Sequence, residues 1–139
     1  MFPGQKKGLE ELGMNESRED YIKTIYALKN KMKVVRSVDI ANEMGYTRPS
    51  VSRATTTLKE KGLITMDGKK GILLTKKGLE MARGIYEKHE LLKDFLLQTT
   101  GTDEKVAEEE ACRMEHFVSA ETMEGIREFI KKSKPDATT

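Results

Sequence analysis

Residues Ser37 to Thr75, SVDIANEMGYTRPSVSRATTTLKEKGLITMDGKKGILLT, give the clearest indication of the fold. The segment from Ser37 has one apolar face at helical spacing, which predicts a short helix. Gly45 ends this helix and supplies a tight turn. Thr47 then stands before Arg48 and Pro49, a hydroxyl cap followed by a proline in the first turn, so a second helix is expected up to the next glycine. Two short helices around a glycine turn predict a helix-turn-helix.

The same stretch ends in two β-type runs, residues 63–66 and 72–75, around the basic, glycine-containing turn 67–71. This arrangement predicts a β-hairpin. Before the stretch, apolar residues at helical spacing predict another helix over about residues 17–31. Three helices followed by a basic hairpin are typical of a winged helix-turn-helix, whose third helix enters the major groove while the wing lies against the sugar-phosphate backbone.

The remainder of the chain is expected to be helical. A long helix is predicted around residues 79–96, a second from a cap at Thr102 and Asp103 to about Phe117, and a third from about residue 119. The last helix is expected to place Met123, Ile126, Phe129 and Ile130 on one face. The predicted fold class is therefore mostly α, an N-terminal winged helix-turn-helix with a small hairpin wing followed by an all-helical domain. The predicted divisions are a flexible arm at 1–13, domains at 14–75 and 76–134, and a tail at 135–139.

Charge is distributed unevenly along these domains. Residues 14–75 hold 12 Lys and Arg against 7 Asp and Glu, whereas residues 76–139 hold 11 against 14. A basic N-terminal half next to an acidic C-terminal half indicates that the N-terminal half binds a polyanion. No apolar run reaches the roughly 18 residues of a membrane span, and the first 13 residues lack the apolar centre of a signal peptide. A single cysteine, Cys112, excludes an intramolecular disulfide, so we expect a cytoplasmic protein.

The segment EACRMEH, residues 110–116, is the strongest candidate for chemistry. Positions i, i+3 and i+4 share a helix face, so Cys112, Glu115 and His116 can converge as thiolate, carboxylate and imidazole metal ligands. His89, on the long helix, also falls on an apolar face. The competing interpretation makes Cys112 a small core residue and His89 a packing residue. An enzyme with Cys112 as nucleophile and His116 as base lacks an orienting third group and an oxyanion loop, so no enzymatic activity is expected.

The predicted third helix has a polar side that suits base edges and phosphates, and the wing turn is basic. An exposed polar face or a protein-binding surface would also explain these residues, but the charge of this half favours DNA. The candidate DNA-binding residues are Thr47, Arg48, Pro49, Ser50, Ser52, Arg53, Lys69 and Lys70.

Four segments in order, SREDYIKTI from Ser17, PSVS from Pro49, KHELL from Lys88 and EACRMEH from Glu110, resemble the diphtheria toxin repressor family of metal-dependent transcriptional regulators, including its manganese-sensing branch. The resemblance covers about residues 14–133. It implies a homodimer, formed through the helical domain, in which a divalent metal activates binding to double-stranded operator DNA and usually represses metal-uptake genes.

The resemblance also implies a ligand set. Its members are Asp20, His89, Cys112, Glu115 and His116, with Glu108 as a further candidate. The set is a hybrid, since Asp20 matches the manganese branch and Cys112 the iron branch. The oxygen ligands suit Mn(II) and the thiolate suits Fe(II), which are the expected cofactors, while Zn(II), Co(II) or Ni(II) are expected to bind in vitro.

Two lysines depart from the family pattern. Lys23 occupies the place of a glutamate ligand of the manganese branch, and Lys93 that of an ancillary glutamate of the iron branch. A protonated lysine cannot bind a metal, which argues against the two-metal arrangement of the manganese branch. One ion held by Asp20 and the helical-half ligands would join the two halves. No membrane partner or organic cofactor is expected. The alternative is a metal-independent winged-helix regulator that responds to an organic ligand or a protein.

Overall fold

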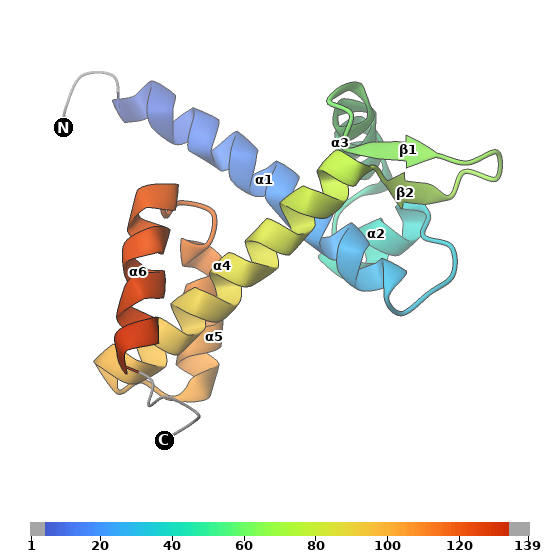
Figure 1. Cartoon of the computed structure of the whole chain (residues 1–139). Coiled ribbons are helices and arrows are strands. Elements are labelled where there is room, and N and C mark those ends of the chain that lie inside the picture. Colours follow the sequence, from blue (N-terminus) through green and yellow to red (C-terminus); the bar gives the residue numbers. More distant parts are fainter. Residues whose placement is uncertain (1–4, 134–139) are drawn as a thin grey trace. The chain divides into compact units, whose positions relative to one another are not determined.

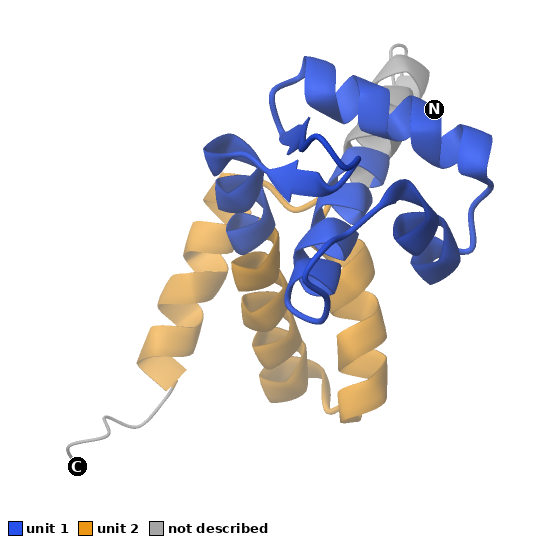
Figure 2. Cartoon of the chain, turned by 90° about the vertical axis from the view of Figure 1, so that its right-hand side faces the viewer, with its two compact units in different colours: residues 1–84 blue, residues 85–139 orange. Residues whose placement is uncertain are grey.

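The structure is a computed structural model that describes residues 5–133, with side chains from Ser17 onwards. The helices and strands are α1 (Gln5–Lys29), α2 (Ser37–Met44), α3 (Arg48–Glu60), β1 (Ile64–Met66), β2 (Ile72–Leu74), α4 (Lys76–Thr100), α5 (Glu104–Met114) and α6 (Ala120–Ser133) (Figure 1). The mostly helical class with one hairpin is thus confirmed. The chain divides into a first unit, residues 1–84, and a second unit, residues 85–139, with α4 running from one into the other (Figure 2).

The helix-turn-helix forms as its cap residues predict. The backbone N–H of Arg36 donates to the Asp39 carboxylate at 2.9 Å before α2, and the helix ends at Gly45, whose φ of +69° suits glycine. Thr47 precedes α3, and its hydroxyl oxygen accepts a hydrogen bond from the backbone N–H of Ser50 at 3.3 Å. Local sequence therefore sets both ends of the turn between α2 and α3.

The wing is the antiparallel hairpin β1–β2, in which Ile64 pairs with Leu74 and Met66 with Ile72. The backbone N–H of Ile72 also donates to the carbonyl of Val35 at 2.7 Å, which ties the hairpin to the segment before α2. Asp67 organises the turn, since its Oδ1 accepts the N–H groups of Lys69 and Gly71, each at 2.8 Å. The sequence predicted the hairpin but not this role of Asp67.

The hydrophobic core of the first unit joins α1, α2, α3, the hairpin and the start of α4. It includes Ile22, Ile25, Val35, Ile40, Val51, Leu58, Leu63, Ile72 and Ala82, all buried. The second unit has its own core, formed by Leu92, Ala111, Met123, Ile126 and Ile130. Each unit therefore buries apolar side chains of its own, which fixes the helices that carry the candidate site residues.

Three predictions about element bounds or faces need correction. The expected arm at 1–13 is helical from Gln5 onwards, because α1 begins there and its first turns are rich in helix-forming Lys, Glu and Leu; residues 1–4 lie outside the described part. The helix expected to reach Phe117 ends at Met114, and residues 115–117 form a turn. Phe129 is 45% exposed, since it lies at the edge of the apolar face and contacts Phe95 edge to face.

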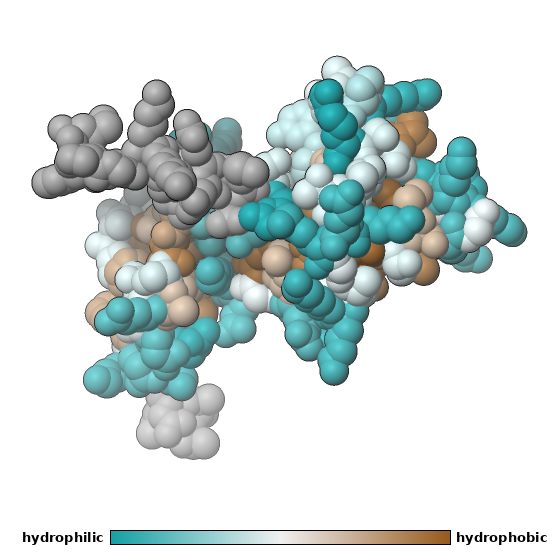
Figure 3. All heavy atoms as spheres, turned by 90° about the horizontal axis from the view of Figure 1, so that it is seen from above, coloured by the Kyte–Doolittle hydropathy of each residue, from teal (hydrophilic) through white to brown (hydrophobic). Residues whose placement is uncertain are grey.

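Large apolar side chains on the surface are scattered, as Figure 3 shows for one face, where hydrophilic residues separate the hydrophobic patches. Among the described residues, no helix combines the length and the apolar character that a membrane crossing requires.

Candidate functional site

His89 is the buried centre of a polar cluster in the second unit, and Glu108 lies at the exposed edge of this cluster. His89 lies on α4 with 4% of its surface exposed. Its Nδ1 lies 2.8 Å from Oε2 of Glu115, and its Nε2 lies 2.8 Å from Oε1 of Glu108. A buried imidazole with both ring nitrogens on carboxylates is compatible with both interpretations of His89, a hydrogen-bonded packing residue and a metal ligand.

Glu115 occupies the most enclosed position in this cluster. It follows the last turn of α5, where its backbone N–H donates to the carbonyl of Ala111, and its side chain has no exposed surface. Its Oε1 lies 3.6 Å from Nε2 of His116, which is also buried. A fully buried carboxylate is costly unless it is paired, and here two imidazoles flank it.

The donor chemistry of this cluster fits a divalent transition-metal ion. One buried carboxylate and two imidazoles, from Glu115, His89 and His116, are ligand types that such ions use. Within the described residues, however, no group of three or more His, Cys, Asp or Glu side chains stands in an arrangement that could hold a metal. The cluster therefore contains side chains of the types that bind metals, but in this structure hydrogen bonds and close contacts join them to one another.

The structure does not place all the predicted ligands in this cluster. Cys112 is exposed on α5, so its interpretation as a small core residue is wrong. Asp20 is half-buried on α1, in the first unit. Their assignment as ligands stays a prediction.

Glu108 connects the cluster to Lys93, a contact that sequence reasoning missed. The Lys93 Nζ lies 3.1 Å from Oε2 of Glu108 and 3.3 Å from Oε1 of Glu104. Burial alone would raise the pKa of Glu108, but hydrogen bonds from Lys93 and His89 outweigh burial and lower it. The signal in the sequence was the pair of acids four residues apart on α5, which share one helix face.

The candidate DNA-binding residues lie on α3, on its cap and on the wing of the first unit. Arg48, Pro49, Ser52 and Arg53 are exposed, whereas Ser50 is half-buried. Thr47 and Ser50 are partly occupied by capping, because the Thr47 hydroxyl donates to Oγ of Ser50 at 2.9 Å. The arginines thus remain the more available groups for a polyanion.

Lys69 and Lys70 stand at the exposed tip of the wing. Lys70 is the one non-glycine residue of the described part with a positive φ, 63°. This left-handed conformation costs a lysine about 1–2 kcal/mol relative to its favoured regions. The wing turn therefore carries the charge of Lys70 at a strained backbone position.

Comparisons with known proteins agree with both parts of the chain. The iron-dependent repressor N-terminal DNA-binding domain matches residues 14–72, and the iron-dependent repressor metal-binding and dimerisation domain matches residues 75–137.

Two curated relatives match this chain over most of their own length, whereas the chain spans about half of a similar solved structure. An uncharacterised HTH-type transcriptional regulator of Methanocaldococcus jannaschii is 35% identical over 122 residues, which cover 87% of this chain and 98% of the relative. The transcriptional regulator MntR of Escherichia coli O157:H7 is 33% identical over 124 residues, covering 89% of this chain and 79% of the relative. The solved structure of the manganese regulator SloR is similar at a TM-score of 0.72 and 34% identity over 84% of this chain, which spans 54% of that structure.

Proposed function

This chain belongs to the iron-dependent repressor family, which includes the diphtheria toxin repressor, and from this premise we propose that it is a metal-dependent transcriptional regulator. With Mn(II) or Fe(II) as the activating ion, a homodimer binds double-stranded operator DNA in the cytoplasm and represses genes of metal uptake. Zn(II), Co(II) and Ni(II) are ions that the same donors accept in vitro.

The observation that carries this proposal is the burial of Glu115 between His89 and His116. A bound divalent ion would supply positive charge next to the buried Glu115 carboxylate, whose negative charge has two imidazoles beside it. The centre of the proposed ligand set consists of His89, Glu115 and His116. Cys112, on the exposed side of α5, is a further proposed ligand. Asp20 is the ligand that we assign to the first unit.

The first unit supplies the proposed DNA contacts. Arg48 and Arg53 project from α3 as exposed cations, which suits contacts with base edges or phosphates in the major groove. Lys69 and Lys70 at the wing suit the adjacent backbone phosphates. Thr47, Pro49, Ser50 and Ser52 set and line the start of the helix.

Calorimetric titration of the metal-free protein with Mn(II), and with Fe(II) under anaerobic conditions, tests the metal site. We expect saturable binding that His116→Ala abolishes. The same titration of Glu109→Gln, an exposed acid on α5, serves as the control and is expected to match the wild type.

DNA binding is tested with a duplex selected from random sequences in the presence of Mn(II). We expect the wild type to bind this duplex at least tenfold more tightly with metal than without it. Binding that is indifferent to metal would instead support a winged-helix regulator whose signal is an organic ligand or a protein.

A further inference from the structure

The second unit contains an unbroken chain of polar contacts that begins at a lysine and ends at the proposed metal ligands. Lys93 contacts Oε2 of Glu108 at 3.1 Å, and the other oxygen of that carboxylate lies 2.8 Å from Nε2 of His89. The opposite ring nitrogen, Nδ1, lies 2.8 Å from Glu115. Glu108 therefore has one oxygen on a cation and the other on the imidazole.

Lys93 is well placed to act as a fixed charge. Its side chain is 21% exposed, and it contacts Glu104 as well as Glu108. The Lys93 ammonium group donates hydrogen bonds to the carboxylates of Glu108 and Glu104, and these bonds raise the pKa of Lys93 above its ordinary value. A side chain held by two carboxylates from the neighbouring helix has a defined position, unlike a lysine on an open surface.

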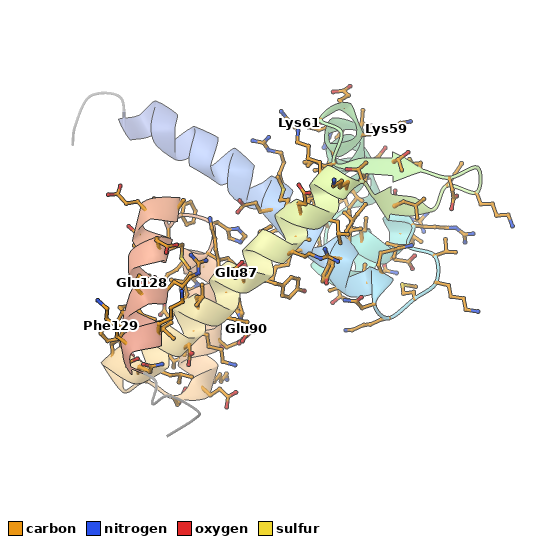
Figure 4. The ribbon with its side chains drawn as sticks, viewed as in Figure 1. Lys59, Lys61, Glu87, Glu90, Glu128 and Phe129 are labelled. Atoms are coloured by element: carbon orange, nitrogen blue, oxygen red, sulfur yellow. The ribbon has the colours of Figure 1, made fainter. Side chains whose placement is uncertain are left out.

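The surroundings of Lys93 are otherwise acidic. A groove beside it is lined by Glu90, Asp94 and Glu104 together with apolar residues of α4 and α6. Glu90 is labelled on α4 in Figure 4. Lys93 is the single basic residue among the described residues that line this groove. The position that a second cation would take near Glu104 and Glu108 is thus filled by a side chain of the protein itself.

The two ring nitrogens of His89 contact different carboxylates, Nε2 that of Glu108 and Nδ1 that of Glu115. A histidine that binds a metal uses one ring nitrogen for the ion, and its other N–H commonly donates to a carboxylate, which fixes the orientation of the ring. Glu108 occupies the Nε2 side and is held there by Lys93. The Nδ1 side faces Glu115, the buried carboxylate of the proposed ligand set.

We propose that Lys93 is a built-in cation that holds Glu108 against Nε2 of His89, so that His89 presents Nδ1 to the metal and Glu108 is a positioning residue rather than a ligand. The inference rests on the proposed function, because it assigns roles around the same metal site. It also implies a single ion for each subunit, since both oxygens of Glu108 are engaged.

The first test compares Mn(II) binding by calorimetry in the wild type, Lys93→Gln and Lys93→Arg. We expect one ion for each subunit in the wild type. If Glu108 leaves His89 when Lys93 is removed, the Mn(II) affinity of Lys93→Gln falls by about 10-fold to 100-fold, the usual effect of losing the outer partner of a ligand. Lys93→Arg keeps the charge and is expected to recover most of the loss. Lys105→Gln makes the same charge change at an exposed position of α5 and is expected to leave the affinity within about twofold.

The direction in which the Mn(II) affinity of Lys93→Gln changes distinguishes a positioning role of Lys93 from a purely electrostatic effect of its charge. Removing a nearby positive charge would by itself tighten the binding of a cation, whereas loss of the support for His89 weakens it. Unchanged or tighter binding in Lys93→Gln would overturn the inference, and so would two ions for each subunit in the wild type. If the wild type binds no metal at all, it is the proposed function that fails. Thermal unfolding of each metal-free variant establishes that the fold is intact.

The second test observes the ring of His89 directly. The chain has two histidines, so ¹⁵N-labelled histidine gives two imidazole patterns. The metal-free His116→Ala variant identifies the pattern of His89 in the metal-free protein, and that pattern is then followed through a titration of the wild type with Zn(II). In the Zn(II)-loaded wild type we expect His89 to carry its proton on Nε2 and the metal on Nδ1. A proton on Nδ1 in the wild type would overturn the inference. We expect Lys93→Gln to lose this single pattern and Lys93→Arg to keep it.

Discussion

Glu115 is the residue on which the metal hypothesis depends most directly. Its carboxylate has no exposed surface, so water does not compensate its charge. His89 contacts one oxygen at 2.8 Å, and His116 lies 3.6 Å from the other. Such a group is stabilised by a cation in a way that an exposed glutamate is not, which makes the free energy of metal binding sensitive to this one side chain.

We therefore expect Glu115→Gln to remove the stabilisation that metal gives the fold. At a free Mn(II) concentration of 100 times its Kd, the wild type should gain about 2.7 kcal/mol of unfolding free energy. The variant should gain none under the same conditions, because an amide supplies no negative charge. Thermal unfolding with and without Mn(II) measures both, each protein being compared with its own metal-free form. A gain in Glu115→Gln equal to that of the wild type would contradict this assignment.

The Asp67 carboxylate makes the wing sensitive to pH. Hydrogen bonds from the backbone N–H groups of Gly71 and Lys69 lower its pKa below the ordinary value of 3.8. A lowered pKa in the folded state means that its stabilising effect is complete above pH 3.8 and is lost as the pH falls through the folded value. We expect Asp67→Ala to unfold at a lower temperature than the wild type at pH 7. The difference between the unfolding temperatures of the wild type and Asp67→Ala should become smaller by pH 3. A difference that does not change with pH would show that the ionised Asp67 carboxylate does not cause it.

Lys70 allows fold and function to be separated at one position. Asparagine tolerates the left-handed conformation that Lys70 adopts with a φ of 63°. Lys70→Asn should therefore keep the stability of the wild type or raise it by up to about 1 kcal/mol. The same change should weaken DNA binding and make the slope of log K against log salt about 0.9 less negative, as expected when one phosphate contact is lost. Denaturant unfolding and salt titrations measure the two effects, and an unchanged salt slope would remove Lys70 from the DNA contacts.

At the scale of helices and strands, the elements that sequence reasoning placed best are those with a local signal. Thr47 and Asp103 cap α3 and α5 where predicted, because a side-chain oxygen next to the first turn satisfies helix N–H groups without help from the rest of the fold. The hairpin was equally predictable from its β-type runs and turn. Local chemistry decides such features, so a single sequence suffices.

Features that depend on distant residues were not predictable. Lys93 and Glu108 meet because α4 and α5 pack together. The spacing of Glu104 and Glu108 indicates one acidic helix face, but it does not identify Lys93 as the residue that lies against that face. Phe129 shares the helical period of its buried neighbours, yet its 45% exposure follows from where the apolar face of α6 ends. The candidate site was predicted by residue type and family resemblance, whereas its pairing of His89 with Glu108 required the structure.

The start of α4 contains a close backbone approach that can be tested with a matched pair of glycines. A Cβ on Gly78 would fall far inside contact distance of the Leu63 carbonyl oxygen, whereas a Cβ on Gly84 would meet no atom within 4 Å. Gly78→Ala should therefore lower the unfolding free energy by about 1–3 kcal/mol. Gly84→Ala should raise it by about 0.4–1 kcal/mol, because alanine favours the helix. Denaturant unfolding of both variants checks the opposite signs, and a shared sign would contradict the packing at Leu63.

At the scale of the whole molecule, the two units carry different chemistry. The basic residues proposed for DNA contact belong to the first unit, and His89, Glu115 and His116 belong to the second. Regulation by metal then needs a coupling free energy between the two binding events, and thermodynamic linkage makes that coupling reciprocal. Asp20 is the one proposed ligand in the first unit, so it is the residue through which we expect the coupling to act.

We therefore expect Asp20→Ala to retain a folded dimer but to lose the stimulation of DNA binding by Mn(II), since the variant's remaining ligands all lie in one unit. Arg53→Ala is the complementary control: it should weaken DNA binding while leaving the Mn(II) affinity of the free protein unchanged, because an exposed cation on α3 acts at the DNA. Sedimentation, calorimetry and DNA titrations with and without Mn(II) measure the three quantities in each variant. If Asp20→Ala kept the full metal stimulation, coupling would have to pass through the protein without this ligand. Equal losses of metal affinity in both variants would instead indicate a general loss of folding.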